Sequence, residues 1–559
     1  MPTLGYDRER TVASPFLRSE RLNTLFRLIR TIRYLRPVQV ANRISRRLRR
    51  PGTARAEPLT CRGPVASWIE AAPRKPVLLG PDRIDLIGIS ADISSPEIWR
   101  DSRKPKLWLY QLHYFDDMNG VGREHRTTWQ RALMDRWMQE NPPGSAVAWD
   151  PYPISLRVVN WIKWQLSGGG TLGDGDLASL CQQVRHLLPR LEYHLLGNHL
   201  LENFKALVFA GCFFQGEEAE GWLAMGMKGL HEQLAEQILP VGAHNELAPM
   251  YQAIITEGVL DTINVLRCHG FAPAQWLTDA AMRMVGWNVS VAHPDGEWPQ
   301  FNDTALGAAP RPGELAAYLL RLALEPRTPD DPSSNPFPRI EWDHWTLIAD
   351  VGGLGPDHNP GHGHADNLTF ELSLFGRRLV VDTGVSTYDV NPVRARERGT
   401  AAHNTLEIDG EDSSEVWGSF RVGRRARTRC IQNSEGVIEA EHDGYRHLPG
   451  SPIHRRAWRC GPERLIVVDE IRSSASHSIR SFIHLHPHYN AAPATDGSCI
   501  VREGDKAIAR VVPESWAHTR VIDRQYAPRF GCLVDAQCIE FTASSSPGVS
   551  RFGFTIEGI

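Results

Sequence analysis

The hydrophobic pattern of the chain changes its period once, near residue 330. Before that point, apolar residues recur every three to four positions in seven successive segments, as amphipathic helices require. The segments are 129–138, 154–166, 177–195, 200–214, 223–238, 251–266 and 280–291. Short loops containing Gly and Pro separate them, so we expect helical hairpins stacked on one another, either as a closed toroid or as an open solenoid.

After a Pro- and Ser-rich stretch at 326–338, apolar residues alternate with polar ones. Leu368, Phe370, Leu372 and Leu374 follow this period of two, and Phe375-Gly376 turns the chain into the next strand. Further strands are predicted at 379–381, 405–408, 436–440, 465–468, 481–485 and 552–556. This half is typical of an antiparallel β-sandwich.

These patterns predict an α+β multidomain chain with four parts. They are a basic helical or irregular segment (1–100), a helical domain (101–326), a linker (327–340) and a β-sandwich domain (341–559).

Composition narrows the class of protein. The 559 residues are 42% hydrophobic and 23% charged, which is typical of a soluble globular chain. No apolar run reaches the ~18 residues that a membrane span needs. A net charge of -3 excludes a generally basic, nucleic-acid-binding protein. The nine cysteines contain no C-x-x-C pair, which argues against a disulfide framework and a zinc ribbon.

The charge is unevenly distributed, because the first 50 residues contain 13 Arg against Asp7, Glu9 and Glu20. Within residues 25–33, Arg alternates with apolar residues at helical spacing. Three interpretations remain open: a surface helix packed on the body, a surface for an anionic polymer, and a membrane-surface helix. No signal peptide is readable, which by itself predicts the cytoplasm.

The strongest chemical signal is a group of histidines and aspartates beside the predicted strands. His362, His364 and Asp366 precede one strand, and Asp382 and His403 follow later strands. Polar groups near a core need partners, and such groups commonly bind a metal or transfer protons. A hydrogen-bonded His–Asp cluster without metal is the alternative. The signal favours an enzyme.

Weaker polar clusters lie in the helical half. Asn198, His199 and Glu202 stand at the start of a predicted helix, with His199 and Glu202 three apart and so on one face. Tyr251 begins another helix, although a single Tyr there is more often a packing residue. An Asn before a helix is likewise more often a cap than a catalyst.

The order of these motifs resembles that of the heparinase II/III-like polysaccharide lyases, which are related to alginate lyases. The resemblance covers about residues 149–420 and rests on Asn198-His199, Tyr251, His362-Gly363-His364, Asp366, Asp382 and His403-Asn404-Thr405-Leu406. It implies an (α/α) toroid followed by an antiparallel β-sandwich, and a periplasmic location.

The resemblance also implies a reaction. Such enzymes remove the C5 proton of a uronic acid and expel the C4 glycosidic oxygen, so the substrate carboxylate must be neutralised and the enolate stabilised. By the resemblance, Asn198 neutralises the carboxylate with support from His199 and Glu202. Tyr251 and His362 act as acid and base across the sugar ring.

Among the remaining site residues, the metal ligands are assigned by the resemblance and the substrate contacts by the charge or aromatic character of their side chains. A structural divalent metal, Zn²⁺ or Mn²⁺, is expected on His364, Asp382 and His403, with no organic cofactor. Substrate contacts are expected from Arg394, Arg398, Trp149, Tyr152 and Asn302. The site should lie in the cleft between the domains, since both contribute to it.

The substrate is expected to be an anionic polysaccharide. Glycosaminoglycans (heparin, heparan sulfate, hyaluronan or chondroitin sulfate) lead, and alginate or a bacterial exopolysaccharide is the alternative. A metal-dependent hydrolase is a rival interpretation, but it leaves Asn198 and Tyr251 unexplained. A non-catalytic polysaccharide-binding protein with the same fold is the other.

Overall fold

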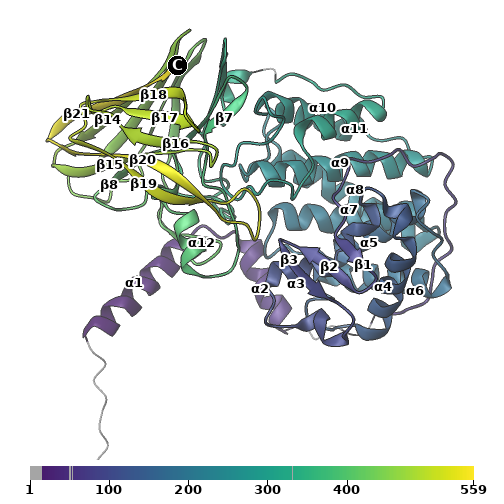
Figure 1. Ribbon diagram of the computed structural model, residues 1–559. Coiled ribbons are helices and arrows are strands. Elements are labelled where there is room, and N and C mark those ends of the chain that lie inside the picture. The colour runs from purple at the N-terminus through teal and green to yellow at the C-terminus, as the bar shows by residue number, and fades with distance from the viewer. Residues whose placement is uncertain (1–14, 49–51, 53, 330) are drawn as a thin grey trace, which may run out of the picture.

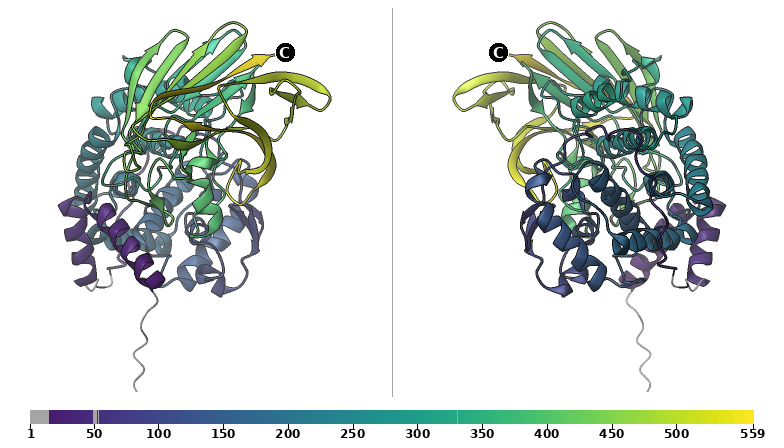
Figure 2. Two further views of the ribbon diagram at one scale, coloured as in Figure 1. Left: turned by 90° about the vertical axis from the view of Figure 1, so that its left-hand side faces the viewer. Right: turned by 90° about the vertical axis from the view of Figure 1, so that its right-hand side faces the viewer.

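The helical and β halves form two domains packed against each other (Figure 1). The structure is a computed structural model that describes residues 15–48, 52, 54–329 and 331–559. Asp7, Glu9 and the arginines before residue 15 or at 49–50 lie outside the described residues. Figure 2 shows from two further sides that the β domain, coloured green to yellow, sits above the helices. Within the described residues, no helix has the length and hydropathy that crossing a bilayer requires.

The helical domain is an (α/α) toroid of stacked hairpins. All seven predicted helices are present, but the third is shorter than expected because Pro189 follows it and cannot continue the hydrogen-bonding pattern. The helices are α3 (Lys106–Leu112), α4 (Thr127–Glu140), α5 (Pro151–Leu166), α6 (Asp174–Leu187), α7 (Gly197–Phe213), α8 (Glu217–Gln237), α9 (Pro249–Cys268), α10 (Gln275–Ser290) and α11 (Pro312–Arg321).

The β domain is an antiparallel sandwich, as predicted. Its large sheet has the order β11-β12-β13-β14-β21-β18-β17-β16. These strands are β11 (Thr428–Ser434), β12 (Val437–His442), β13 (Ile453–Cys460), β14 (Arg464–Ser473), β21 (Gly548–Gly558), β18 (Lys506–Glu514), β17 (Cys499–Glu503) and β16 (Asn490–Pro493).

The β domain also has two four-stranded sheets, in the orders β19-β20-β15-β8 and β4-β5-β6-β7, and the two-stranded sheet of β9 (Val416–Trp417) and β10 (Arg421–Val422). The Val381 amide, just after β7, donates to the His484 carbonyl at the end of β15 at 3.0 Å and links the two four-stranded sheets. Phe370, Trp458 and Phe554 are among the buried side chains that fill the core between the layers. The strands are β19 (His518–Tyr526), β20 (Val534–Ser545), β15 (His477–His484), β8 (Leu406–Ile408), β4 (Arg339–Trp342), β5 (Trp345–Ala349), β6 (Phe370–Leu374) and β7 (Arg377–Val380).

The predicted turn at Phe375-Gly376 is confirmed. Both residues have positive φ, 51° and 77°, as a tight two-residue hairpin requires. Because this hairpin joins β6 to β7, His364 before β6 and Asp382 after β7 lie at the same end of the sheet.

The described part of the N-terminal segment contains more regular structure than the sequence predicts. It contains the helices α1 (Pro15–Ile32) and α2 (Pro37–Leu48), and then a small antiparallel sheet of three strands beside α3 (Figure 1). The strands are too short, at three or four residues, to show a hydrophobic period. They are β1 (Leu78–Gly80), β2 (Arg83–Leu86) and β3 (Ile89–Asp92).

Candidate active site

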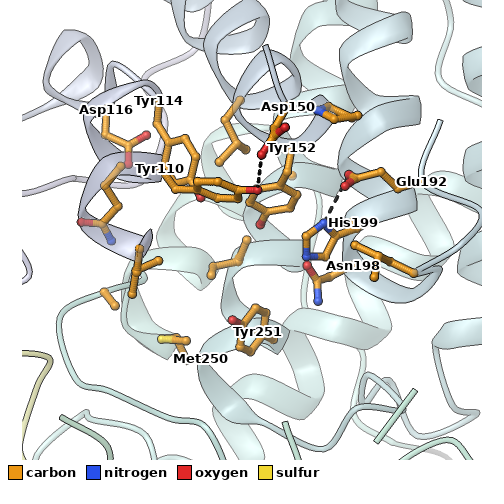
Figure 3. A pocket seen from close by; sticks show the side chains of 18 of the residues that line it. Tyr110, Tyr114, Asp116, Asp150, Tyr152, Glu192, Asn198, His199, Met250 and Tyr251 are labelled. Carbon is orange, nitrogen blue, oxygen red and sulfur yellow. Dashed lines mark hydrogen bonds and ion pairs between the residues drawn. The ribbon is translucent and has the colours of Figure 1, made fainter. Parts of the chain in front are cut away.

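A cavity of about 640 Å³ lies between the two domains and collects most of the predicted catalytic residues. The helical domain contributes Asn198, His199 and Tyr251 to its wall, and the β domain contributes His362. Figure 3 shows the helical side, with His199 next to Asn198 and Tyr251 on a neighbouring helix. The expectation of a site formed by both domains is therefore met by the geometry.

Tyr251 and His362 lie side by side. Their rings stack with centroids 3.8 Å apart and planes 29° apart, which leaves no room for a sugar between them. The expected placement across the sugar ring is therefore wrong, because the residues present one continuous wall to the cavity. A second tyrosine, Tyr388, joins this wall, with its hydroxyl 3.3 Å from the Tyr251 hydroxyl.

A buried carboxylate orients His362. Asp303 Oδ2 lies 2.9 Å from His362 Nδ1, and the same carboxylate contacts Arg394 Nη2 at 2.8 Å and His364 Nε2 at 2.8 Å. Burial alone would raise the pKa of Asp303, but Arg394 and the two imidazoles hold it well below its usual range. An ionised Asp303 accepts a hydrogen bond from His362 Nδ1, so Nε2, which lies 3.8 Å from Glu246 Oε2, is the ring nitrogen left to meet a substrate.

The environment of Tyr251 favours the phenol. Burial and the nearby Asp303 carboxylate raise the pKa of Tyr251 above its ordinary value. The hydroxyl therefore remains protonated near neutral pH and can donate a proton to a leaving oxygen.

Asn198 is the second residue of α7 and follows a strained turn. Leu196 and Gly197 both have positive φ, 65° and 57°. A Cβ at Gly197 would collide with the side chains of Glu246 and Asn359, so glycine is required there. Asn198 Nδ2 donates to Glu246 Oε2 at 3.0 Å, which fixes the orientation of the amide at the cavity wall.

His199 pairs with Glu192 (Nδ1 to Oε2, 3.2 Å) and packs on the Tyr152 ring at 4.4 Å. Burial alone would lower the pKa of His199, but the Glu192 carboxylate outweighs burial and the pKa is raised. The imidazolium can therefore attract a substrate carboxylate. The predicted partner, Glu202, is buried away from the cavity wall and pairs with Lys205 at 2.5 Å. Helical spacing placed Glu202 near His199 but could not show that Lys205 occupies its carboxylate.

Of the five predicted substrate contacts, Tyr152 lines the cavity and the others do not. The Trp149 indole donates to the Asn141 carbonyl at 3.0 Å. The Asn302 amide donates to the Leu247 carbonyl at 2.9 Å. These side chains support the wall from behind, because backbone groups already occupy their polar atoms.

Arg394 and Arg398 are also buried, at 0% and 1% exposure. Arg394 pairs with Asp303, and Arg398 Nη2 donates to the Gly363 carbonyl at 2.8 Å. The structure therefore places both arginines behind the His362 loop, where they position it, and not in contact with the cavity.

The predicted metal ligands come together only in part. His403 Nδ1 lies 2.7 Å from Asp382 Oδ2, and the His364 and His403 ring centroids are 5.4 Å apart. His364 Nδ1 and His403 Nε2 are buried without a hydrogen-bond partner, which suits a metal. The Asp382 carboxylate, however, is already bonded to His403. In the described part of the chain, no group of three or more His, Cys, Asp or Glu side chains is arranged to hold a metal ion.

Comparison with known families agrees with this arrangement. The family model described as "Heparinase II/III N-terminus" matches residues 100–312, and "Heparinase II/III-like, C-terminal" matches residues 334–549. The chain belongs to the heparinase II/III-like family. The two matched regions are the toroid and the β-sandwich.

Individual relatives share little sequence identity with this chain. A heparin-sulfate lyase of Bacteroides stercoris is 23% identical over 433 residues, which cover 66% of this chain and 63% of the relative. A heparin-sulfate lyase of Pedobacter heparinus is 26% identical over 317 residues, covering 49% and 47%. The chain thus spans less than two thirds of the length of these relatives. The crystal structure of heparinase III shares the fold, with a TM-score of 0.65 at 18% identity, over 85% of this chain and 80% of that one.

Three residues of the family member's site were not assigned from the sequence. They are Asp303, which orients His362; Glu246, which orients Asn198; and Tyr388, which contacts Tyr251. Asp303 and Glu246 lie in motifs whose polar character is visible in the sequence. Nothing in the sequence indicates Tyr388, because it reaches the cavity from a loop far along the chain.

Proposed function

We propose that this protein is a polysaccharide lyase that cleaves a uronic-acid-containing anionic polysaccharide by β-elimination at the C4 glycosidic bond. The observation that carries the proposal is the stacked pair of Tyr251 and His362 beside Asn198 and His199 in one cavity. The named activity of the relatives, heparin-sulfate lyase, supports a glycosaminoglycan of the heparin or heparan sulfate type as substrate. Alginate or a bacterial exopolysaccharide is the alternative.

The proposed reaction uses each residue once. The uronate carboxylate lies against the Asn198 amide and the His199 imidazolium, which stabilise the charge that develops as the enolate forms. His362 Nε2 removes the C5 proton, and the C–H electron pair becomes the C4=C5 double bond. The C4–O bond breaks, and the Tyr251 hydroxyl protonates the leaving oxygen.

The side-by-side acid and base suggest which uronate reacts. A base and an acid on one wall reach a proton and a leaving oxygen on the same face of the sugar. In D-glucuronate C5–H and C4–O share a face, whereas in L-iduronate they lie on opposite faces. We therefore expect faster cleavage at glucuronate than at iduronate.

A panel of heparan sulfate, heparin, hyaluronan, chondroitin sulfate and alginate tests the proposal. Elimination produces a conjugated double bond that absorbs in the ultraviolet, together with new reducing ends, in equal amounts. Reducing ends without ultraviolet absorbance would indicate the rival metal-dependent hydrolase. Binding without either product would indicate a non-catalytic binding protein.

A structural metal is a separate part of the proposal. Zn²⁺ or Mn²⁺ would satisfy the two unpartnered nitrogens, His364 Nδ1 and His403 Nε2. Asp382 bonds to His403 Nδ1 and would either orient that ring or exchange this bond for the metal. Such an ion would brace the β-domain side of the cavity and takes no part in the elimination.

A further inference from the structure

Helix α2 turns its apolar residues to solvent and a polar face toward the protein. Val40, Ile44 and Leu48 are 41%, 55% and 78% exposed, whereas Gln39 is 1% exposed. A helix on a globular protein normally turns its apolar face inward. The inward face of α2 is polar, and what it faces is the cavity between the domains, because Arg46 lines that cavity.

Contacts to both domains fix α2 at this position (Figure 1). Gln39 Nε2 donates to the Leu195 carbonyl of the helical domain at 3.5 Å and to the His358 carbonyl, in the loop before β6, at 3.3 Å. Arg36 pairs with Glu236 at the end of α8 at 2.5 Å. The helix therefore bridges the two domains at the edge of the cavity.

Two arginines of α2 converge on one residue of the cavity wall. Arg46 Nη1 lies 3.1 Å from His194 Nδ1, and Arg43 Nη2 donates to the His194 carbonyl at 3.3 Å. Burial and Arg46 lower the pKa of His194 to about 4, so this ring is neutral and supplies no counter-charge. Burial and the nearby Arg421 likewise lower the pKa of Arg43, as expected where cations crowd together.

The cations elsewhere in the cavity are neutralised. Lys163 pairs with Asp261 at 2.6 Å, and Arg74 pairs with Glu257. In contrast, no carboxylate of the described residues pairs with Arg43, Arg46 or the cavity-lining Lys106. The positive charge of this side of the cavity is therefore available to an anionic ligand.

Helix α1 provides a useful contrast. Its Arg30 binds Glu415 at 2.5 Å, and Arg27 binds the same carboxylate at 3.2 Å. Helix α1 thus meets the body through its arginines and not through an apolar face, because Phe26 and Ile29 are 52% and 53% exposed. Of the three interpretations of the arginine-rich segment, a surface for an anionic polymer fits the arginines of α2.

We propose that Arg43 and Arg46 of α2 form an anion subsite that binds a carboxylate or sulfate of a sugar unit away from the bond that is cleaved. Guanidinium groups suit this task because they form paired hydrogen bonds with planar or tetrahedral oxyanions. The subsite rests on the proposed function for its polymer. It extends the cavity with a segment outside both family-matched regions, 100–312 and 334–549.

Direct binding tests the subsite without relying on turnover. The Kd of size-defined heparan sulfate oligosaccharides is measured by calorimetry at two salt concentrations, for wild type, Arg46→Ala and the Arg43→Ala/Arg46→Ala double variant. Arg47→Ala is the matched control, because Arg47 is on the same helix but has neither of the contacts to His194 that Arg43 and Arg46 make, and it does not line the cavity. Arg46→Gln, which keeps a donor toward His194, replaces Arg46→Ala if that variant unfolds.

We expect the double variant to bind at least ~10-fold more weakly, with a shallower salt dependence, as expected for losing charge-assisted hydrogen bonds. Arg47→Ala should bind like wild type. A desulfated oligosaccharide identifies the ligand group: a loss confined to sulfated chains assigns sulfate, and an equal loss on both assigns carboxylate. A folded double variant with wild-type Kd and salt dependence overturns the subsite. Wild-type binding that depends on Arg46 without any elimination would overturn the proposed function and leave the subsite standing.

Discussion

Two histidine–aspartate pairs lie close together near the boundary between the domains, and they differ in access. His362 Nδ1 bonds to Asp303 at 2.9 Å, and His403 Nδ1 bonds to Asp382 at 2.7 Å. The His362 side chain is 13% exposed in the cavity wall, whereas the His403 side chain is 0% exposed. The same bonded pair is therefore accessible from the cavity in one place and enclosed in the core in the other.

Access, rather than the hydrogen bond itself, separates the two roles. A general base must reach the proton it removes, and His362 Nε2 can do so beside Tyr251. His403 Nε2 meets no ligand from the cavity, and it can act only through packing, hydrogen bonding or a bound ion. Variants at the two pairs should consequently separate activity from stability.

The largest expected effect is on activity at His362. His362→Ala should lower kcat for elimination by ~10³-fold or more, because a positioned general base is lost. The thermal midpoint should stay close to that of wild type, since Asp303 keeps its bond to Arg394. Initial rates from ultraviolet absorbance and a thermal melt give both values. Turnover within tenfold of wild type by the folded variant would remove His362 from the reaction.

A smaller loss is expected at Asn198. Asn198→Ala removes the amide that Glu246 holds at the cavity wall and should lower kcat by roughly 10²-fold, as for the loss of one preorganised donor. Steady-state kinetics separate kcat from KM. A higher KM with unchanged kcat would make Asn198 a binding residue only.

Variants of the buried His403–Asp382 pair should lose stability more than activity. His403→Ala leaves the Asp382 carboxylate buried without its partner, and should lower the free energy of unfolding by ~3–5 kcal/mol. Chemical denaturation measures this change. An equally stable variant with lost activity would contradict the structural role of the pair.

Measuring metal content tests whether the buried cluster of His364, Asp382 and His403 holds an ion. If an ion binds, His364→Ala or Asp382→Ala should lower both bound metal and the thermal midpoint, since a site filled only in the native state adds to stability. Elemental analysis of protein purified without chelator measures the metal. Absence of stoichiometric metal would favour a hydrogen-bonded cluster.

The smallest expected effect is a shift in pH dependence at His199. Burial alone would lower the pKa of His199, but Glu192 raises it, so the imidazolium persists above its unfolded pKa of about 6.5 and is lost as pH rises through the raised value. The charged form of His199 therefore makes its full contribution to folding stability below pH ~6.5. The alkaline limb of kcat/KM should therefore move to lower pH in Glu192→Gln. Identical limbs in both proteins would show that His199 does not carry the charge that binds substrate.

The sequence predicts the fold better than it predicts the site. The periods of 3.6 and 2 match one-sided burial in elements such as α4, α8, β12 and β14. Helices α7 and α9 and strand β6 are buried on nearly all sides. Strands β1–β3 have only three or four residues each, which is too short for a hydrophobic period to be visible in the sequence. The inverted amphipathicity of α2 could not be foreseen, since a pattern shows that a helix has two faces and not which one is buried.

The site residues show the same limit. The resemblance correctly brought Asn198, His199, Tyr251 and His362 to one cavity. It placed Glu202 beside His199, whereas the Glu202 carboxylate pairs with Lys205. The charge of Arg394 suggested a contact with substrate, but this arginine is buried and pairs with Asp303 behind His362.

The shared role of Tyr251 and His362 is tested most directly by a double-variant cycle. The kcat for elimination is measured for Tyr251→Phe, His362→Ala and the double variant, with thermal melts confirming that each is folded. Because an acid and a base that act in one step fail together, the double variant should be no more than ~10-fold slower than the slower single variant. Losses that multiply in full would show that the two residues act independently, and would contradict a single acid–base pair in this cavity.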